Sequence, residues 1–185
     1  RRAKVHAVLL AAGRSSRMGG PNKLLAGFGG KPLVRLVAER VLSSRADGVV
    51  VVTGHQSERV REALKGQNVR LADNPDFASG LAGSLKAGIR ALPADAEAAM
   101  IVLGDMPGLS TADFDALITA FARSSGQAIV RATHAGKRGN PVILPRSVFP
   151  AIETLEGDVG ARHLDETSGM EFVDKILKCV DCGND

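Results

Sequence analysis

The strongest constraint on the fold is the alternation of strand-like runs with amphipathic segments long enough to form helices. Short β-branched and apolar runs predict four strands, at 4–10, 48–54, 68–74 and 98–105. Apolar residues at helical spacing predict four helices, at 32–44, 57–66, 79–92 and 110–124. Strands joined by helices of this length pair in parallel through right-handed crossovers. The sequence therefore predicts an α/β fold, a three-layer α/β/α sandwich around a mostly parallel sheet.

The remainder of the chain continues this pattern less regularly. Two further strands at 126–133 and 139–145 form an added pair, and short helices follow at 146–155, interrupted by Pro150, and at 160–167. A chain of 185 residues without a linker or low-complexity tract is expected to form one domain, 1–185.

Several helix ends have recognisable residues. Pro32 suits a first helical turn, Ser79 is a candidate N-cap, and Ser110 with Asp113 resembles a capping box. The helix at 79–92 contains three glycines, and each costs about 1 kcal/mol relative to alanine. This cost predicts that another part of the backbone or core approaches the helix closely.

Composition excludes several classes of protein. The apolar runs are too short to cross a bilayer, and the first residues have no signal-peptide pattern, so we expect a cytoplasmic protein without a membrane partner. The chain has no Trp or Tyr, which argues against single-stranded nucleic acid as a partner. Cys179 and Cys182 lack a second pair of metal ligands and are interpreted as ordinary thiols.

Positive charge is concentrated at the beginning of the chain. Residues 1–45 contain ten Lys and Arg and one acid, whereas the remainder contains fourteen bases and nineteen acids. This asymmetry fits a substrate with several phosphates, bound by a positive wall. Helical spacing assigns Arg35, Arg40 and Arg45 to a solvated helix face.

The loop at 11–23 combines glycines with positive charge directly after the first strand. Its glycines at 13, 19 and 20 leave backbone N–H groups open to an anion. Arg17 offers a planar guanidinium that can bind two phosphate oxygens, and Lys23 offers a compact positive charge. The loop matches neither the Walker A pattern nor the G-x-G-x-x-G dinucleotide fingerprint. In parallel sheets, ligands bind beyond the carboxyl ends of the strands, where this loop lies.

Three other segments are candidates for the same site. Asp105 ends the fourth strand within "LGDMP" and can hold Mg²⁺ beside nucleotide phosphates, unless it caps the next helix, a position that Ser110 suits better. The segment 74–88 presents small and polar residues at a helix start, which suits either ligand binding or close packing. In "GDVGAR", at 157–162, Asp158 has the position of a turn or N-cap residue.

These residues resemble a known family. "LAAGRSSRMGGPNKLL" is similar to the L-A-A-G-x-S-x-R-M-G-x-x-K-L signature of MobA-like nucleotidyltransferases, with one additional residue between Gly19 and Lys23. The segments "TGHQ", "LGDMP", "RGNPVILP" and "GDVGAR" follow in that family's order. "LAAG" resembles the molybdenum cofactor cytidylyltransferase branch, where the guanylyl branch has "LAGG". The family's acidic C-terminal segment is replaced here by "KILKCVDCGND", with Asp181 a partial substitute.

The resemblance implies a Rossmann-like fold of the nucleotide-diphospho-sugar transferase type and transfer of CMP from CTP, favoured over GTP, to the phosphate of molybdopterin. It implies Mg²⁺ as cofactor, bound by Asp105, with Arg17 and Lys23 as the other catalytic residues. The implied nucleotide-binding residues are Ala11, Ala12, Gly13, Arg17, Gly19, Lys23, Asn74, Gly80, Ser84 and Asp105. The second substrate would face Asp158, Gly160 and Arg162.

Two alternatives stay open. One is a cytidylyl- or uridylyltransferase that acts on a sugar or alditol phosphate, because such enzymes have a related glycine-rich loop. The other is a non-catalytic chaperone that binds molybdopterin and passes it to a molybdoenzyme. The transfer itself requires no general base, since the attacking phosphate is already ionised, and His55 is interpreted as structural.

Overall fold

The fold was analysed in a computed structural model that describes residues 2–13, 22–134, 137–157, 159–160 and 172–176. Seven strands in these residues form one sheet: β1 Val5–Ala11, β4 Gly48–Thr53, β5 Arg70–Asp73, β6 Ala98–Leu103, β7 Ile129–His134, β8 Lys137–Pro145 and β9 Phe172–Ile176. The α-helices are α1 Leu33–Leu42, α2 Ser57–Ala63, α3 Leu81–Arg90, α4 Thr111–Arg123 and α5 Phe149–Ile152. Three short 3₁₀ helices are η2 Lys23–Leu25, η3 Phe77–Ser79 and η4 Arg146–Val148.

The sheet has the order β5-β4-β1-β6-β8-β7-β9. Neighbouring strands from β5 to β6 are parallel, β8 is antiparallel to both β6 and β7, and β9 is parallel to β7. All strands except β8 therefore run in one direction, which confirms the predicted mostly parallel sheet.

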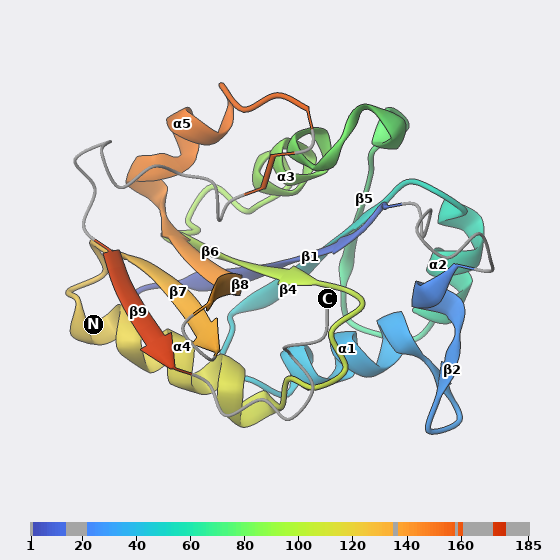
Figure 1. The fold of residues 1–185 in the computed structure, drawn as a ribbon, viewed down its shortest axis with the longest axis horizontal. Helices are drawn as coiled ribbons and strands as arrows, with labels where there is room; N and C mark the ends of the chain where they lie inside the picture. Colours follow the sequence, from blue (N-terminus) through green and yellow to red (C-terminus); the bar gives the residue numbers. More distant parts are fainter. Residues whose placement is uncertain (1, 14–21, 135–136, 158, 161–171, 177–185) are drawn as a thin grey trace.

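Helices cover both faces of the sheet, as Figure 1 shows. Along β1, Ala7 and Leu9 pack with α1 and α4 on one face, whereas Val8 and Leu10 pack with α3 and α5 on the other. Each strand residue in these two cores is almost completely buried, because a central strand of a sandwich has no solvent-exposed face. The three-layer α/β/α fold is confirmed.

Of the three glycines predicted to allow close approach, Gly88 does so, whereas Gly83 has an ordinary contact distance and Gly80 precedes the helix. A Cβ placed on Gly88 of α3 would overlap Val8 of β1 and lie 3.0 Å from Val52 Cγ2 of β4. A Cβ on Gly83 would lie 3.4 Å from Asn74 Nδ2. These contacts seat α3 directly on the sheet and on the segment after β5.

Helix ends both confirm and correct the predictions. Ser110 and Asp113 form a complete capping box at the start of α4. Ser79 does not cap α3, because its hydroxyl donates to Asp76 O at 2.8 Å, and Gly80 precedes the helix with φ 120°. Pro150 lies in the first turn of α5 and so begins this helix rather than interrupting it. Pro32 is the residue before α1 rather than its first turn.

Two elements were not predicted. The strand β9 adds to β7 at one end of the sheet, where Arg131 of β7 pairs with Asp174 of β9 at 2.9 Å. The two-residue strands β2 Gly27–Phe28 and β3 Lys31–Pro32 form a hairpin through Gly29 and Gly30, both at positive φ. Most of the predicted helix at 160–167 and both cysteines lie outside the described residues.

None of the helices in the described residues is sufficiently long and apolar to traverse a lipid bilayer.

Candidate active site

The carboxyl ends of four adjacent strands are joined directly to one another. The Gly104 N–H, after β6, donates to Leu10 O of β1 at 3.0 Å. The His55 N–H, after β4, donates to Ala12 O at 3.1 Å. The Asn74 N–H, after β5, donates to Thr53 O of β4 at 2.7 Å. The predicted residues Ala11, Ala12, Gly13, Asn74 and Asp105 therefore share one edge of the sheet.

The helix η2 brings Lys23 to this edge. Asn22 begins the helix and its Oδ1 accepts from the Leu24 N–H at 3.0 Å. Leu24 is buried, and its Cδ2 lies 2.9 Å from the position of a Cβ on Gly104. Leu24 and Gly104 are in contact, and Lys23 and Asp105 are their direct neighbours in the chain, Lys23 before Leu24 and Asp105 after Gly104. Both side chains are exposed.

Asp105 has the properties of a ligand-binding carboxylate. Within the described residues it makes no hydrogen bond or ion pair, and Ser110 supplies the cap of α4 that Asp105 might otherwise provide. These residues contain no group of three His, Cys, Asp or Glu side chains that could hold a metal alone. One free carboxylate fits Mg²⁺, which commonly takes most of its other ligands from phosphates and water.

Asn74 and Ser84 form a buried polar pair. Asn74 Nδ2 donates to Ser84 Oγ at 3.0 Å, while Asn74 Oδ1 accepts from the Asp76 N–H at 3.2 Å. The two residues are only 7% and 4% exposed. The pair ties the segment after β5 to α3, and both ends of the Asn74 amide are used within the protein.

The segment that contains Gly160 packs against the beginning of α3. The Ala82 N–H donates to Gly157 O at 3.1 Å. Gly160 is buried, and a Cβ on it would lie 2.7 Å from Leu81 Cδ2. The structure therefore brings Gly80 and Gly160, predicted for two different substrates, to the same end of α3. Arg17, Gly19, Asp158 and Arg162 lie outside the described residues.

Comparison with known proteins decides the family. The family described as the MobA-like NTP transferase domain matches residues 7–171 of this chain. The chain belongs to the MobA-like NTP transferase family. The predicted resemblance is thus confirmed, and this family supports a transferase of the nucleotidyl type.

Two relatives of this MobA-like domain illustrate its range. The nicotine blue oxidoreductase of Paenarthrobacter nicotinovorans is 31% identical over 163 residues, which cover 85% of this chain and 79% of the relative. The bifunctional protein GlmU of Kineococcus radiotolerans is 36% identical over 126 residues, which cover 66% of this chain and 25% of GlmU. The matched region is therefore only about a quarter of GlmU.

Solved structures show the same MobA-like fold. Rv0371c of Mycobacterium tuberculosis has a TM-score of 0.84 and 22% identity, covering 96% of this chain and 89% of that one. A second structure of Rv0371c, in complex with manganese, has a TM-score of 0.80. A CMP:2-keto-3-deoxy-manno-octonic acid synthetase complexed with CTP has a TM-score of 0.76 and 16% identity, covering 95% and 90%.

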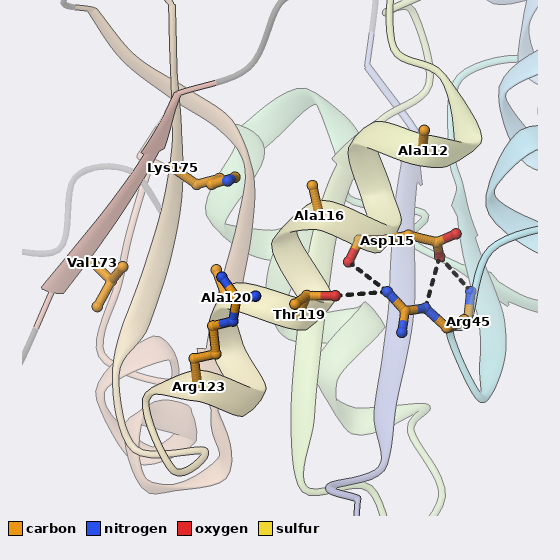
Figure 2. A pocket seen from close by; sticks show the side chains of 9 residues that line it. All are labelled: Arg45, Ala112, Asp115, Ala116, Thr119, Ala120, Arg123, Val173 and Lys175. Atoms are coloured by element: carbon orange, nitrogen blue, oxygen red, sulfur yellow. Dashed lines mark hydrogen bonds and ion pairs between the residues drawn. The ribbon is translucent and has the colours of Figure 1, made fainter.

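Arg35 and Arg40 of α1 are half-buried rather than on a solvated face, whereas Arg45 is exposed, as predicted, with 54% of its side chain accessible. Arg35 donates to the carbonyl of Ala63, the last residue of α2, at 3.3 Å and to Lys65 O at 3.0 Å. Arg40 donates to Pro107 O and to Leu109 O, the latter at 3.0 Å. Figure 2 shows Arg45 against α4, where its guanidinium donates to Thr119 Oγ1 at 2.6 Å. The helical spacing of the three arginines does not indicate these hydrogen-bond partners, because the partners are distant from them in sequence.

Two cavities lie outside the predicted site. One of about 570 Å³ lies between α4 and β9, where Arg45, Arg123 and Lys175 border it (Figure 2). The other, of about 410 Å³, lies beside η2 and α2 and includes Leu25, Pro32 and Arg59 in its lining. None of the predicted site residues that the structure describes lines either cavity, so the candidate site is defined by the carboxyl edge of the sheet rather than by these cavities.

Proposed function

We propose that this protein transfers CMP from CTP to the terminal phosphate of molybdopterin and releases pyrophosphate. One observation supports this most strongly. Lys23 and the unpartnered carboxylate of Asp105 lie on either side of the Leu24–Gly104 contact, at the carboxyl edge of the sheet. A cation and a free carboxylate in this arrangement suit a metal-bound polyphosphate.

The reaction depends on positioning and on neutralising charge. An oxygen of the acceptor phosphate attacks the α-phosphorus of CTP, the bond from this phosphorus to the β-phosphate oxygen breaks, and pyrophosphate leaves. Lys23 neutralises negative charge on the phosphates, together with Arg17 and the backbone N–H groups around Gly13 and Gly19. Mg²⁺ held by Asp105 would supply further neutralisation of the phosphates.

In this proposal, the beginning of α3 and Gly80 before it organise both substrates. The Asn74–Ser84 pair holds the segment after β5 against the nucleoside, and Gly80 permits its close approach. The proposal assigns the acceptor to Asp158, Gly160 and Arg162. The packing of Gly157 and Gly160 on the first turn of α3 supports an acceptor position next to the nucleoside. The alanines at 11 and 12 support cytosine as the base, and a cytoplasmic location gives access to CTP.

The test measures binding and transfer separately. Calorimetry with CTP and GTP in Mg²⁺ gives the preferred nucleotide, and a pyrophosphate-release assay with molybdopterin, sugar phosphates and alditol phosphates gives the acceptor. We expect release with CTP and molybdopterin. Release only with a sugar or alditol phosphate would replace the acceptor, and binding of molybdopterin without release would identify a chaperone.

A redox reaction is a second candidate because the relative at 31% identity is named nicotine blue oxidoreductase. The loop at 11–23 lacks the G-x-G-x-x-G fingerprint of dinucleotide binding, which favours the transferase. Incubation of the protein with nicotine blue and NADH or NADPH separates the two. Loss of the dye colour together with no pyrophosphate release from CTP would overturn the transferase proposal.

A further inference from the structure

Arg40 holds the loop that carries Asp105. It is a partly buried residue of α1, and its Nη1 donates to Pro107 O and to Leu109 O at 3.0 Å. In return, the Thr111 hydroxyl donates to Arg40 O at 2.8 Å. Three hydrogen bonds thus join one residue of α1 to the connection between β6 and α4 and to the first residue of α4, about 70 residues later in the chain.

These bonds complete the support of the 104–109 loop. At its beginning, the Gly104 N–H donates to Leu10 O, and Leu24 packs against Gly104. At its end, Leu109 is buried and Ser110 caps α4. Between these points Arg40 gives the Pro107 and Leu109 carbonyls their partners. Since Asp105 stands two residues before Pro107, its position depends on this end of the loop as well as on β1.

We propose that Arg40 is a positioning residue, which fixes the Asp105 carboxylate for a divalent cation by binding the Pro107 and Leu109 carbonyls. This inference rests on the proposed function, in which Asp105 holds the cation. Removal of the guanidinium leaves two carbonyls without this partner. The loop then samples positions in which Asp105 is displaced, and displacements near 1 Å cost about a hundredfold in rate.

The chain contains a matched control for this effect. Arg35 lies on the same helix and also donates to two backbone carbonyls, those of Ala63 and Lys65, but these lie at and just beyond the C-terminal end of α2. Replacing either arginine by methionine keeps most of the apolar stem of the side chain and removes the guanidinium group that donates these hydrogen bonds. If Arg40 only connected α1 to a neighbouring segment, Arg40→Met and Arg35→Met would have the same effect on cation binding and on the rate of transfer.

The experiment compares wild type, Arg40→Met, Arg40→Lys and Arg35→Met by three measurements. Hydrogen exchange of the free protein reports on the 104–109 loop, calorimetry reports Mn²⁺ binding in the presence of CTP, and steady-state transfer is titrated with Mg²⁺. In Arg40→Met we expect about tenfold faster exchange at 104–109, a tenfold higher half-saturating cation concentration and a tenfold to hundredfold lower kcat. CTP binding measured without a divalent cation is expected to stay at the wild-type value.

Arg40→Lys is expected to be intermediate, because lysine keeps a charged donor but its flexible, strongly hydrated ammonium group does not reproduce the rigid geometry of the guanidinium. Arg35→Met is expected to exchange faster only near 63–66, with a wild-type response to Mg²⁺. If Arg40→Met does not fold, Arg40→Lys and Thr111→Val provide the same readouts.

Wild-type exchange at 104–109 or wild-type cation affinity in the Arg40 variants would overturn the positioning role. A different result, in which the wild-type protein neither binds Mn²⁺ nor transfers CMP, would overturn the proposed function. The exchange measurement would still show whether Arg40 holds the loop in that case.

Discussion

Lys23 and Asp105 are exposed charged side chains on either side of the Leu24–Gly104 contact, at the carboxyl edge of the sheet. Asp105 has no hydrogen-bond or ion-pair partner within the described residues, and Lys23 belongs to a helix that is anchored by Asn22 and Leu24. Substitutions of exposed side chains usually change stability little, so activity and folding can be measured independently here.

We expect Lys23→Ala and Asp105→Ala each to lower the rate of transfer about a hundredfold, which corresponds to about 3 kcal/mol of transition-state stabilisation. Both variants should unfold at wild-type denaturant concentrations. Lys65→Ala, which removes an exposed lysine distant from this edge, is the control for loss of a positive charge. A purified Asp105→Ala protein with nearly full transfer would contradict the mechanism.

Gln56 is a residue under local strain. Its φ of 54° and ψ of 41° are left-handed, and its Oε1 is buried without a hydrogen-bond partner. We expect Gln56→Gly to raise the free energy of unfolding by about 1 kcal/mol, because glycine adopts this conformation readily and no buried oxygen is left unpaired. Urea denaturation measures the change.

Ser125→Gly is the matched control, since Ser125 also has a positive φ of 61° but lies beyond the end of α4. Its gain should be smaller than that of Gln56→Gly, because only backbone strain is relieved. A Gln56→Gly protein less stable than wild type would show that the side chain stabilises the fold through its other contacts.

At the scale of elements, the site is assembled by close approach between segments that follow different strands. Gly54 shows this most directly. A Cβ on it would lie 2.7 Å from Phe77 Cβ, 2.9 Å from Ala12 Cβ and 3.0 Å from Asn74 O. None of these atoms is the end of a flexible side chain, so a larger residue must push the segments after β1 and β5 apart.

We therefore expect Gly54→Ala to destabilise the protein by about 1–3 kcal/mol and to weaken nucleotide binding as well. Thermal unfolding and calorimetry with CTP measure the two effects. Gly27→Ala is the control, because nothing lies within 4 Å of a Cβ at that position. Wild-type stability in Gly54→Ala would show that the segments can separate without cost.

The hairpin of β2 and β3 is tied to α1 by charge. Lys31 Nζ and Glu39 Oε2 lie 2.7 Å apart, and this hydrogen bond, with help from Arg35, lowers the pKa of Glu39. A carboxyl whose pKa is lower in the folded state stabilises the protein above its unfolded pKa, and this stabilisation is lost as the pH falls through the folded pKa.

Glu39→Gln should consequently be less stable than wild type at pH 7. The difference between the two proteins should begin to shrink near the ordinary glutamate pKa of about 4.3 and should disappear once the pH is below the lowered pKa of Glu39 in the folded protein. Urea denaturation at a series of pH values measures it. The side chain is partly exposed, so we expect a small effect that added salt reduces further. A difference that persists unchanged at low pH would exclude the ion pair as its cause.

At the scale of the whole molecule, the positive charge of residues 1–45 has two uses. Among the basic residues of this region that the structure describes, five form ion pairs with acids. Four of these pairs connect separate segments: Arg2 with Asp47, Lys4 with Asp95, Lys31 with Glu39, and Arg45 with Asp115, while Arg35 pairs with Glu39 on its own helix. Much of the predicted positive wall therefore stabilises the fold. In the proposed function, the phosphates are bound by the basic residues of the loop at 11–23.

The sequence by itself determined the periodic elements and the family. The runs that became β1, β4 and β6 are apolar enough to require burial on both faces, and Ser110 with Asp113 defines the start of α4 locally. The position of Asp105 after a buried strand followed from the same local pattern. Such features depend on residues near one another in the chain, and they are therefore visible in it.

Only the tertiary structure decided how these segments are held together. β9 joins the sheet because β7 offers it a parallel partner, and five residues without strong apolar alternation do not predict this. Arg40 appeared to lie on a solvated face, since nothing in its helix indicates the carbonyls of Pro107 and Leu109. The same holds for the Leu24–Gly104 contact, which joins the segments that carry Lys23 and Asp105. Contacts of this kind depend on where the chain returns in space, and spacing along the sequence does not specify that.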